Sequence, residues 1–156
     1  MNQHIKEIVS VLKTFSIPFK ILENDESLLF FNTIINEYAR KEVYKYPLWE
    51  NLSNWCGVDY RYSWEWFNQI IETNDLILFF EPEDDKNFIL IDNAVDLIKL
   101  INNSYRFTFY ISNIEAEFLY CYNDHDNLLA SGKDIKWLSS YDFIIKNGIT
   151  LFSNKS

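Results

Sequence analysis

The chain has 156 residues, of which 48% are hydrophobic and 18% aromatic, and its formal net charge is −9 at pH 7. Such an apolar content excludes an intrinsically disordered chain, and the length predicts a single domain, residues 1–156. The excess of acids excludes binding to the phosphate backbone of nucleic acids, which needs a basic face. It favours a protein partner that is itself basic.

The first part of the sequence is predicted to be helical. In residues 2–15 apolar side chains recur at three- and four-residue steps, and residues 25–43 show the same pattern. Residues 46–55 predict a short helical turn, and residues 63–74 a third helix capped by Ser63. The predicted buried stripe of the second helix consists of Leu28, Phe31, Ile34, Ile35 and Tyr38.

The second part of the sequence changes to strand patterns. Residues 76–82 are an apolar run of strand length, 83–87 predict a turn, and 88–92 predict its hairpin partner. Residues 93–103 return to helical spacing. The wholly apolar run at 76–80 predicts a central strand that is covered on both sides.

Three more strands are predicted at residues 106–112, 117–123 and 127–131, then a short helix over 134–143 capped by Asp134, and a frayed end. The order is therefore N-terminal helices followed by β-β-α-β-β-β-α. Tight turns between strands imply antiparallel pairing. We expect an α+β fold in which the helices pack on one face of an antiparallel sheet.

Targeting signals are lacking in the sequence. The N-terminus has no signal-peptide apolar region, and no apolar run reaches the length of a membrane span. We therefore expect a cytoplasmic protein without membrane contact, in which Cys56 and Cys121 are reduced and unpaired. Frequent Asn, Ile, Lys, Tyr and Phe with few Ala and Arg indicate an AT-rich, bacterial genome.

The stretch CYNDHDNLL at 121–129 gathers a cysteine, a histidine and two aspartates. A structural zinc site needs four N or S ligands, and the other candidates, His4 and Cys56, are distant in sequence. A Cys121–His125 nucleophile would need both side chains on one face. Asp and Asn are typical turn residues. The interpretation is a hairpin turn, with no metal, no cofactor and no catalytic residue, so the protein is not expected to be an enzyme.

Acidic side chains crowd the two predicted hairpin turns, at 81–87 and 124–126. Paired carboxylates can act as acid and base, but several in one loop are more often a solvated tip. Such tips concentrate negative potential and suit contact with a basic partner. The predicted partner-binding residues are Glu83, Asp84, Asp85, Asp124, His125 and Asp126.

An alternative contact surface is the aromatic segment 44–67, which contains nine aromatic residues. Stacking platforms for single-stranded nucleic acid interleave aromatics with Lys and Arg. Here acids balance the few basic residues. Packing in the core or at a protein interface is the better interpretation.

The stretch FLYCYNDHDNLLASGKDIKWL resembles the closing strand-turn-strand-helix of SUKH-type immunity proteins, over about 20 residues. More broadly, the chain is similar to small acidic immunity proteins of bacterial polymorphic toxin systems. The resemblance implies a protein that neutralises a cognate toxin, often a nuclease, by covering its active site. The Gly-rich segment usual in the SUKH group is missing here.

Two functions follow as expectations. The first is a non-catalytic, immunity-type inhibitor that occludes a basic toxin through an acidic surface. The second is a regulatory or structural protein-interaction domain with a different partner. The sequence leaves the partner and the oligomeric state open.

Overall fold

The computed structural model describes residues 3–105 and 107–153. Its strands are β1 (Phe19–Ile21), β2 (Cys56–Asp59), β3 (Leu76–Phe79), β4 (Ile89–Ile91), β5 (Phe109–Asn113), β6 (Phe118–Tyr122), β7 (Asn127–Gly132) and β8 (Leu151–Ser153). Its α-helices are α1 (Gln3–Thr14), α2 (Asn24–Tyr38), α3 (Phe67–Ile70), α4 (Ala94–Asn102), α5 (Ile135–Ser139) and α6 (Asp142–Lys146). Short 3-10 helices occur at Arg40–Glu42, Leu48–Asn51 and Ser63–Trp66.

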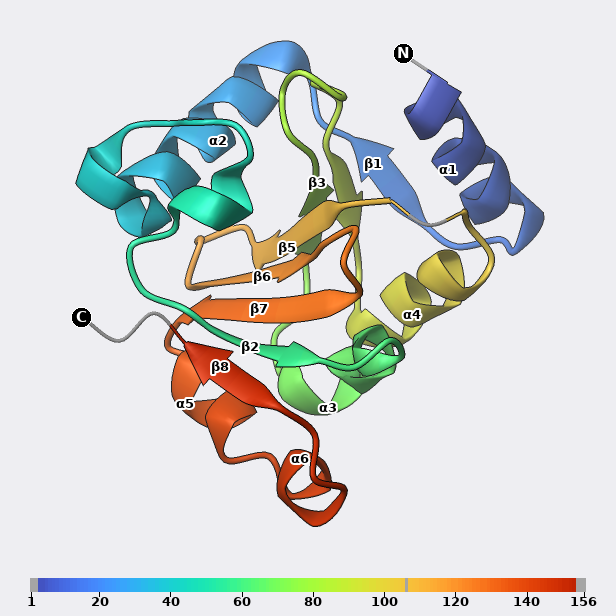
Figure 1. Ribbon diagram of the computed structural model, residues 1–156. Helices are drawn as coiled ribbons and strands as arrows, with labels where there is room; N and C mark the ends of the chain where they lie inside the picture. The colour runs from blue at the N-terminus through green and yellow to red at the C-terminus, as the bar shows by residue number, and fades with distance from the viewer. Residues whose placement is uncertain (1–2, 106, 154–156) are drawn as a thin grey trace.

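These strands form one sheet in the order β1-β4-β3-β5-β6-β7-β2-β8, and every neighbouring pair is antiparallel (Figure 1). The predicted α+β class is confirmed, as is the central, fully buried position of β3. The start of the first helix, the start of strand 106–112 and the frayed end fall partly on residues 1–2, 106 and 154–156, outside the described residues.

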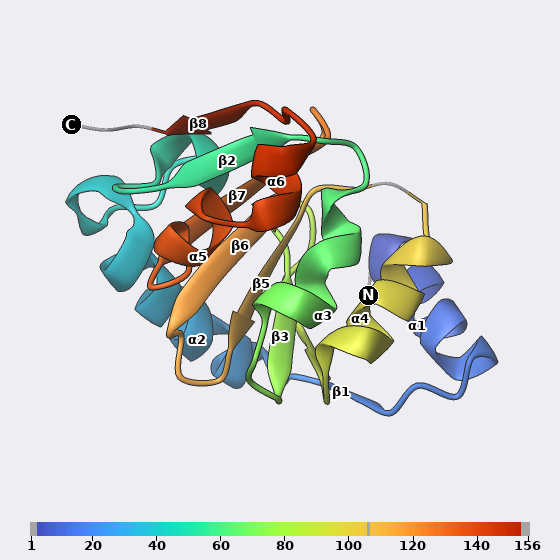
Figure 2. The same cartoon turned by 90° about the horizontal axis from the view of Figure 1, so that it is seen from below.

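Helices cover both faces of the sheet, so the expectation that they pack on one face is wrong. Leu76 and Leu78 of β3 join a core formed with α1, α3, α4, α5 and α6. Ile77 and Phe79 join a second core formed with α2 and the 3-10 helix Leu48–Asn51. In Figure 2, α3, α5 and α6 lie in front of the strands and α2 lies behind them. Side chains alternate along a strand, so wholly apolar strands need a cover on each side.

Three strands were not expected from the sequence: β1, β2 and β8. Each has only three or four residues, and β2 receives its partners β7 and β8 from the C-terminal part of the chain. The helix predicted at 63–74 is shorter, a 3-10 turn followed by α3. Ser63 is not its cap, because the N-cap residue is Tyr62.

The predicted stripe of α2 is wrong at one position. Leu28 is 61% exposed, whereas Phe30, absent from the predicted stripe, is buried against Phe79 with ring centroids 5.4 Å apart. The run Leu-Leu-Phe-Phe offers four apolar residues in succession, and only the sheet beneath decides which of them face inward. In α5, Asp134 occupies the N-cap position but makes no capping hydrogen bond with its side chain.

Candidate functional site: an acidic–aromatic end of the sheet

Both acidic turns lie at the same end of the sheet. Phe79 near the end of β3 pairs with Tyr110, Tyr110 pairs with Cys121, and Cys121 pairs with Leu129 near the start of β7. β3 and β6 are both antiparallel to β5, which lies between them, so the β3–β4 connection and the β6–β7 turn leave the sheet in the same direction. The hairpin turn predicted within 121–129 is confirmed.

Four of the six predicted partner-binding residues are exposed on these turns. Glu83 and Asp84 lie on the β3–β4 connection. On the β6–β7 turn the side chains of Asp124 and His125 are 71% and 64% exposed, with His125 Nε2 3.8 Å from Asp124 Oδ1. These four side chains can reach a partner without any change in the fold.

The other two predicted residues serve the turns themselves. Asp85 is only 4% exposed, and its Oδ1 accepts hydrogen bonds from the backbone N and side-chain Nδ2 of Asn87, at 2.8 and 2.9 Å. Asp126 is half-buried, and its Oδ1 lies 3.0 Å from Tyr122 Oη, which also lies 2.7 Å from the Arg61 carbonyl oxygen. Asp85 is therefore no contact residue, because local backbone bonding draws its carboxylate inward.

Aromatic residues of the segment 44–49 lie between the two turns. The Trp49 ring meets the His125 ring edge-on, with centroids 5.6 Å apart. Tyr46 is 60% exposed, and the negative charge of Asp84 raises its pKa, with smaller effects of burial and of three other carboxylates that include Asp124. Carboxylates of both turns therefore act electrostatically on Tyr46. We call Glu83, Asp84, Asp124, His125, Tyr46 and Trp49 the acidic–aromatic end.

A buried carboxyl group lies behind this surface. Glu81 is 2% exposed and accepts hydrogen bonds from the Leu48 backbone N at 3.0 and 3.1 Å, and its Oε1 is hydrogen-bonded to Tyr44 Oη at 2.8 Å. Tyr110 Oη also donates to it and accepts from the Trp49 backbone N at 3.0 Å. Burial raises the pKa of Glu81. The sequence prediction of a wholly solvated acidic tip is wrong for this residue.

Cys121 and His125 do not form a nucleophile pair. Cys121 is 1% exposed in the core on the α2 side of the sheet, and burial raises the pKa of its thiol well above the ordinary value. His125 projects into solvent from the turn. A thiol that stays protonated inside a core has the properties of a small apolar residue.

In the rest of the aromatic segment 44–67, Tyr60 and Trp66 pack against α6. Trp66 is buried, and its ring stacks on that of Tyr60 with centroids 5.4 Å apart and planes 9° apart. Both rings also meet Phe143 of α6 edge-on. These residues attach α6 to the sheet, which confirms packing as the role of this part of the segment.

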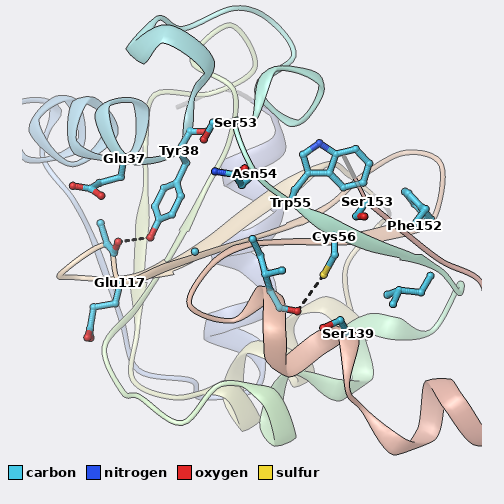
Figure 3. A pocket seen from close by; sticks show the side chains of 14 residues that line it. Glu37, Tyr38, Ser53, Asn54, Trp55, Cys56, Glu117, Ser139, Phe152 and Ser153 are labelled. Atoms are coloured by element: carbon cyan, nitrogen blue, oxygen red, sulfur yellow. Dashed lines mark hydrogen bonds between the residues drawn. The ribbon is translucent and has the colours of Figure 1, made fainter. Parts of the chain in front are cut away.

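A groove of about 790 Å³ opens at the opposite end of the sheet (Figure 3). Trp55 and Phe152 line it, and Cys56 Sγ donates a hydrogen bond to the Ile135 carbonyl at 3.4 Å. Burial raises the pKa of the Cys56 thiol to about 11, so the thiol is protonated at neutral pH. Its hydrogen bond is that of a structural cysteine.

Metal-binding clusters and membrane-spanning helices are both absent from the described ranges 3–105 and 107–153. No cluster there brings together three or more His, Cys, Asp or Glu side chains that could hold a metal ion. No helix in the same ranges has the length and apolar character to cross a membrane.

Sequence reasoning missed Glu81 and gave Tyr46 and Trp49 no separate role. One signal for Glu81 was present: it directly follows five buried apolar residues, 76–80. For Tyr46 and Trp49 no local signal exists, because their position depends on the contact of the 44–49 segment with β5 and the two turns. Comparisons with protein-family models, curated proteins and solved structures give no match.

Proposed function

We infer that the protein is a non-catalytic binding protein, an immunity-type inhibitor that covers a basic toxin, such as a nuclease, with its acidic–aromatic end. One observation carries this proposal. The fold gathers exposed carboxylates from two separate turns around Tyr46 and Trp49 at a single end of the sheet.

Each part of that surface has a role in binding. Carboxylates spaced over two turns create a negative potential that attracts a basic partner and speeds its approach. Tyr and Trp are the residues that most often contribute large contact energies at protein interfaces. Exposed carboxylates that resemble the phosphates of a nucleic acid would occupy the basic active site of a nuclease.

The first test is genetic. The product of the gene next to this one in its host is produced in a bacterium alone and together with the protein. We expect growth to stop with the neighbour alone and to resume with both. A harmless neighbour, or a toxic one that the protein does not neutralise, contradicts the immunity function.

The second test changes the charge of the surface. Asp84→Asn combined with Asp124→Asn should slow association with the neutralised toxin about tenfold at low salt, and added salt should slow the wild type in the same way. Glu72→Gln with Asp75→Asn is the matched control, because both residues are exposed at the opposite end of β3. Equal slowing by both variants would show that net charge, and not this surface, matters.

A second candidate function is a regulatory or structural interaction domain that binds a different partner. The groove beside Trp55 and Phe152 favours it, because the groove is concave and half-apolar and lies away from the acidic turns. For this candidate, Trp55→Ala should weaken binding of the partner, while Asp84→Asn with Asp124→Asn should leave it unchanged.

A further inference from the structure

The segment 44–49 is hydrogen-bonded to the sheet around one buried carboxyl group, that of Glu81. Glu81 accepts the Leu48 backbone N–H, and Tyr110, which is hydrogen-bonded to Glu81, accepts the Trp49 backbone N–H. Tyr44 Oη contacts Glu81 Oε1 at 2.8 Å. Tyr46 and Trp49, the aromatic part of the acidic–aromatic end, are thus held from behind by a residue that a partner cannot touch.

The hydrogen bonds of Tyr44 bear on the protonation of two glutamates. Tyr44 Oη lies 2.8 Å from Glu81 Oε1 and 2.6 Å from Glu83 Oε2. An ionised carboxylate only accepts hydrogen bonds, and a tyrosine hydroxyl has one hydrogen to donate. If both glutamates were ionised, one of these two short contacts would bring two oxygens together without a hydrogen between them. A proton on one of the two carboxyl groups removes this conflict.

Burial decides which glutamate has the proton. Glu81 is 2% exposed, whereas Glu83 lies at the surface. Removing a charge from water is costly, so the buried group is the neutral one. We propose that Glu81 is the positioning residue of the acidic–aromatic end and acts in its protonated form, donating to Tyr44, which in turn donates to Glu83.

The surroundings of Glu81 fit a neutral carboxyl group. The ionisable groups near it are Tyr44, Tyr46 and Glu83 on the outer side, Tyr110 on β5 and Cys121 on β6. None of these is a cation, and Glu81 forms no ion pair with any residue in the described part of the chain. Burial is the largest effect on its pKa and raises it, the hydrogen bonds with Tyr110, Leu48 and Tyr44 oppose this shift, and the charge of Glu83 adds to it.

The consequence for binding rests on the proposed function. Below the midpoint of Glu81 titration, the chain of hydrogen bonds joins the segment 44–49 to the β3–β4 connection. Above it, Tyr44 has one proton for two carboxylates, and its link to Glu83 or to Glu81 is lost. The surface offered to a basic partner is therefore ordered by a proton that the partner never contacts.

The proton is tested without any partner, by carbon-13 NMR of the side-chain carboxyl groups. The signal that disappears in Glu81→Gln should titrate above the ordinary glutamate value of about 4.3. Glu83→Gln should lower that midpoint, because Tyr44 can then donate to ionised Glu81. In a Tyr44→Phe background the effect of Glu83→Gln should shrink. A midpoint at the ordinary value, or an effect of Glu83→Gln that Tyr44→Phe leaves unchanged, overturns the proposal.

The positioning role is tested with a lysine decapeptide as the basic probe, below the measured midpoint. Glu81→Gln, which keeps a donor and an acceptor, should bind it as the wild type does. Glu81→Ala should bind about tenfold more weakly. If Glu81→Ala does not fold, Tyr110→Phe takes its place in the test. It removes the hydroxyl that accepts the Trp49 N–H and should also weaken binding. Undiminished binding by a folded Glu81→Ala or Tyr110→Phe refutes the positioning role.

These outcomes separate the two proposals. If Asp84→Asn with Asp124→Asn does not weaken peptide binding, the proposed function fails, while the NMR titration still decides whether Glu81 holds the proton. If the titration gives an ordinary midpoint, the inference fails even where the acidic variants weaken binding.

Discussion

The Glu81 carboxyl group links the stability of the fold to pH. Burial raises its pKa in the folded protein, so between the unfolded value of about 4.3 and the folded midpoint the folded state binds more protons than the unfolded state. The contribution of Glu81 to the free energy of unfolding is therefore complete below about pH 4.3 and is lost as the pH rises through the folded midpoint.

Glu81→Gln isolates this effect from the other acids of a chain with net charge −9. We expect the free energy of unfolding of the wild type to fall, relative to that of Glu81→Gln, as the pH rises from about 4.5 to neutrality. Urea unfolding at a series of pH values measures the difference. If the free energies of unfolding of the two proteins change with pH in parallel, the pKa of Glu81 is the same in the folded and unfolded states.

The two cysteines provide a second prediction for single residues. Cys56 belongs to the core beneath α5 and Cys121 to the core beneath α2, on opposite faces of the sheet. Both should be reduced, and both should react slowly with a thiol reagent in the native protein, because burial keeps them protonated. Unfolding without a reductant should release two reactive thiols. A rapid native reaction, or fewer than two thiols after unfolding, contradicts this.

Gly57 allows β2 to approach its neighbours closely. A Cβ atom at this position would lie 2.4 Å from Leu129 Cδ2 and 3.0 Å from the Phe152 ring. Leu129 is buried and cannot move aside freely. Gly57→Ala should lower the free energy of unfolding by about 1–3 kcal/mol in urea unfolding. In a Leu129→Ala background the same change should cost clearly less, and an equal cost in both would exclude this clash as the cause.

For the acidic residues, the sequence predicted the location of the turns but not which side chains are buried. The crowding of Glu83, Asp84 and Asp124 was visible, and all three are exposed. Asp85 looked the same in sequence, yet its hydrogen bonds to Asn87 turn it inward. Glu81 is buried among hydrogen-bond partners from distant segments, which are Tyr44, the Leu48 backbone and Tyr110. Composition predicts the charge of a turn, but not which of its carboxylates find donors.

Among the elements, α2 offers a test of helix capping. The Glu26 carboxylate accepts a hydrogen bond from the Glu23 backbone N at 3.2 Å and lies 3.5 Å from Lys20 Nζ. Glu26→Ala should lower the free energy of unfolding by about 0.5–1 kcal/mol. Glu26→Gln keeps the acceptor and removes only the exposed ion pair, so it should be nearly neutral. If the two variants lose equal stability in thermal or urea unfolding, the capping bond is not the cause.

Elements with strong local patterns were predictable, and short ones were not. The amphipathic α1 and α4 and the strands β3 to β7 have apolar periodicity or tight turns of their own. In contrast, β1, β2 and β8 have three or four residues each and are strands because of what they pair with. Their hydrogen-bond partners lie in other parts of the sequence, so no local window contains the cause.

At the scale of the whole molecule, the α+β class followed from the order of elements, but the arrangement of layers did not. Periodicity tells that α2 has an apolar side without telling which face of the sheet that side covers. The full burial of β5 and β6 requires helices on both faces. The acidic turns are local in sequence and could be proposed from it. The placement of Tyr46 and Trp49 between them depends on distant segments and required the tertiary structure.

The strand order also determines when each strand can pair during synthesis. In the sheet, β2 at residues 56–59 lies between β7 and β8, so neither neighbour exists until residues 127–153 have been synthesised. In contrast, β5 pairs with β6 and β6 pairs with β7, each the next strand along the chain, and such local pairing is fast. Amide hydrogen exchange should therefore be slowest in β5 and β6 and faster in β8. During synthesis β2 therefore stays without strand partners until β7 has been made, and the sheet closes around it only after residues 151–153.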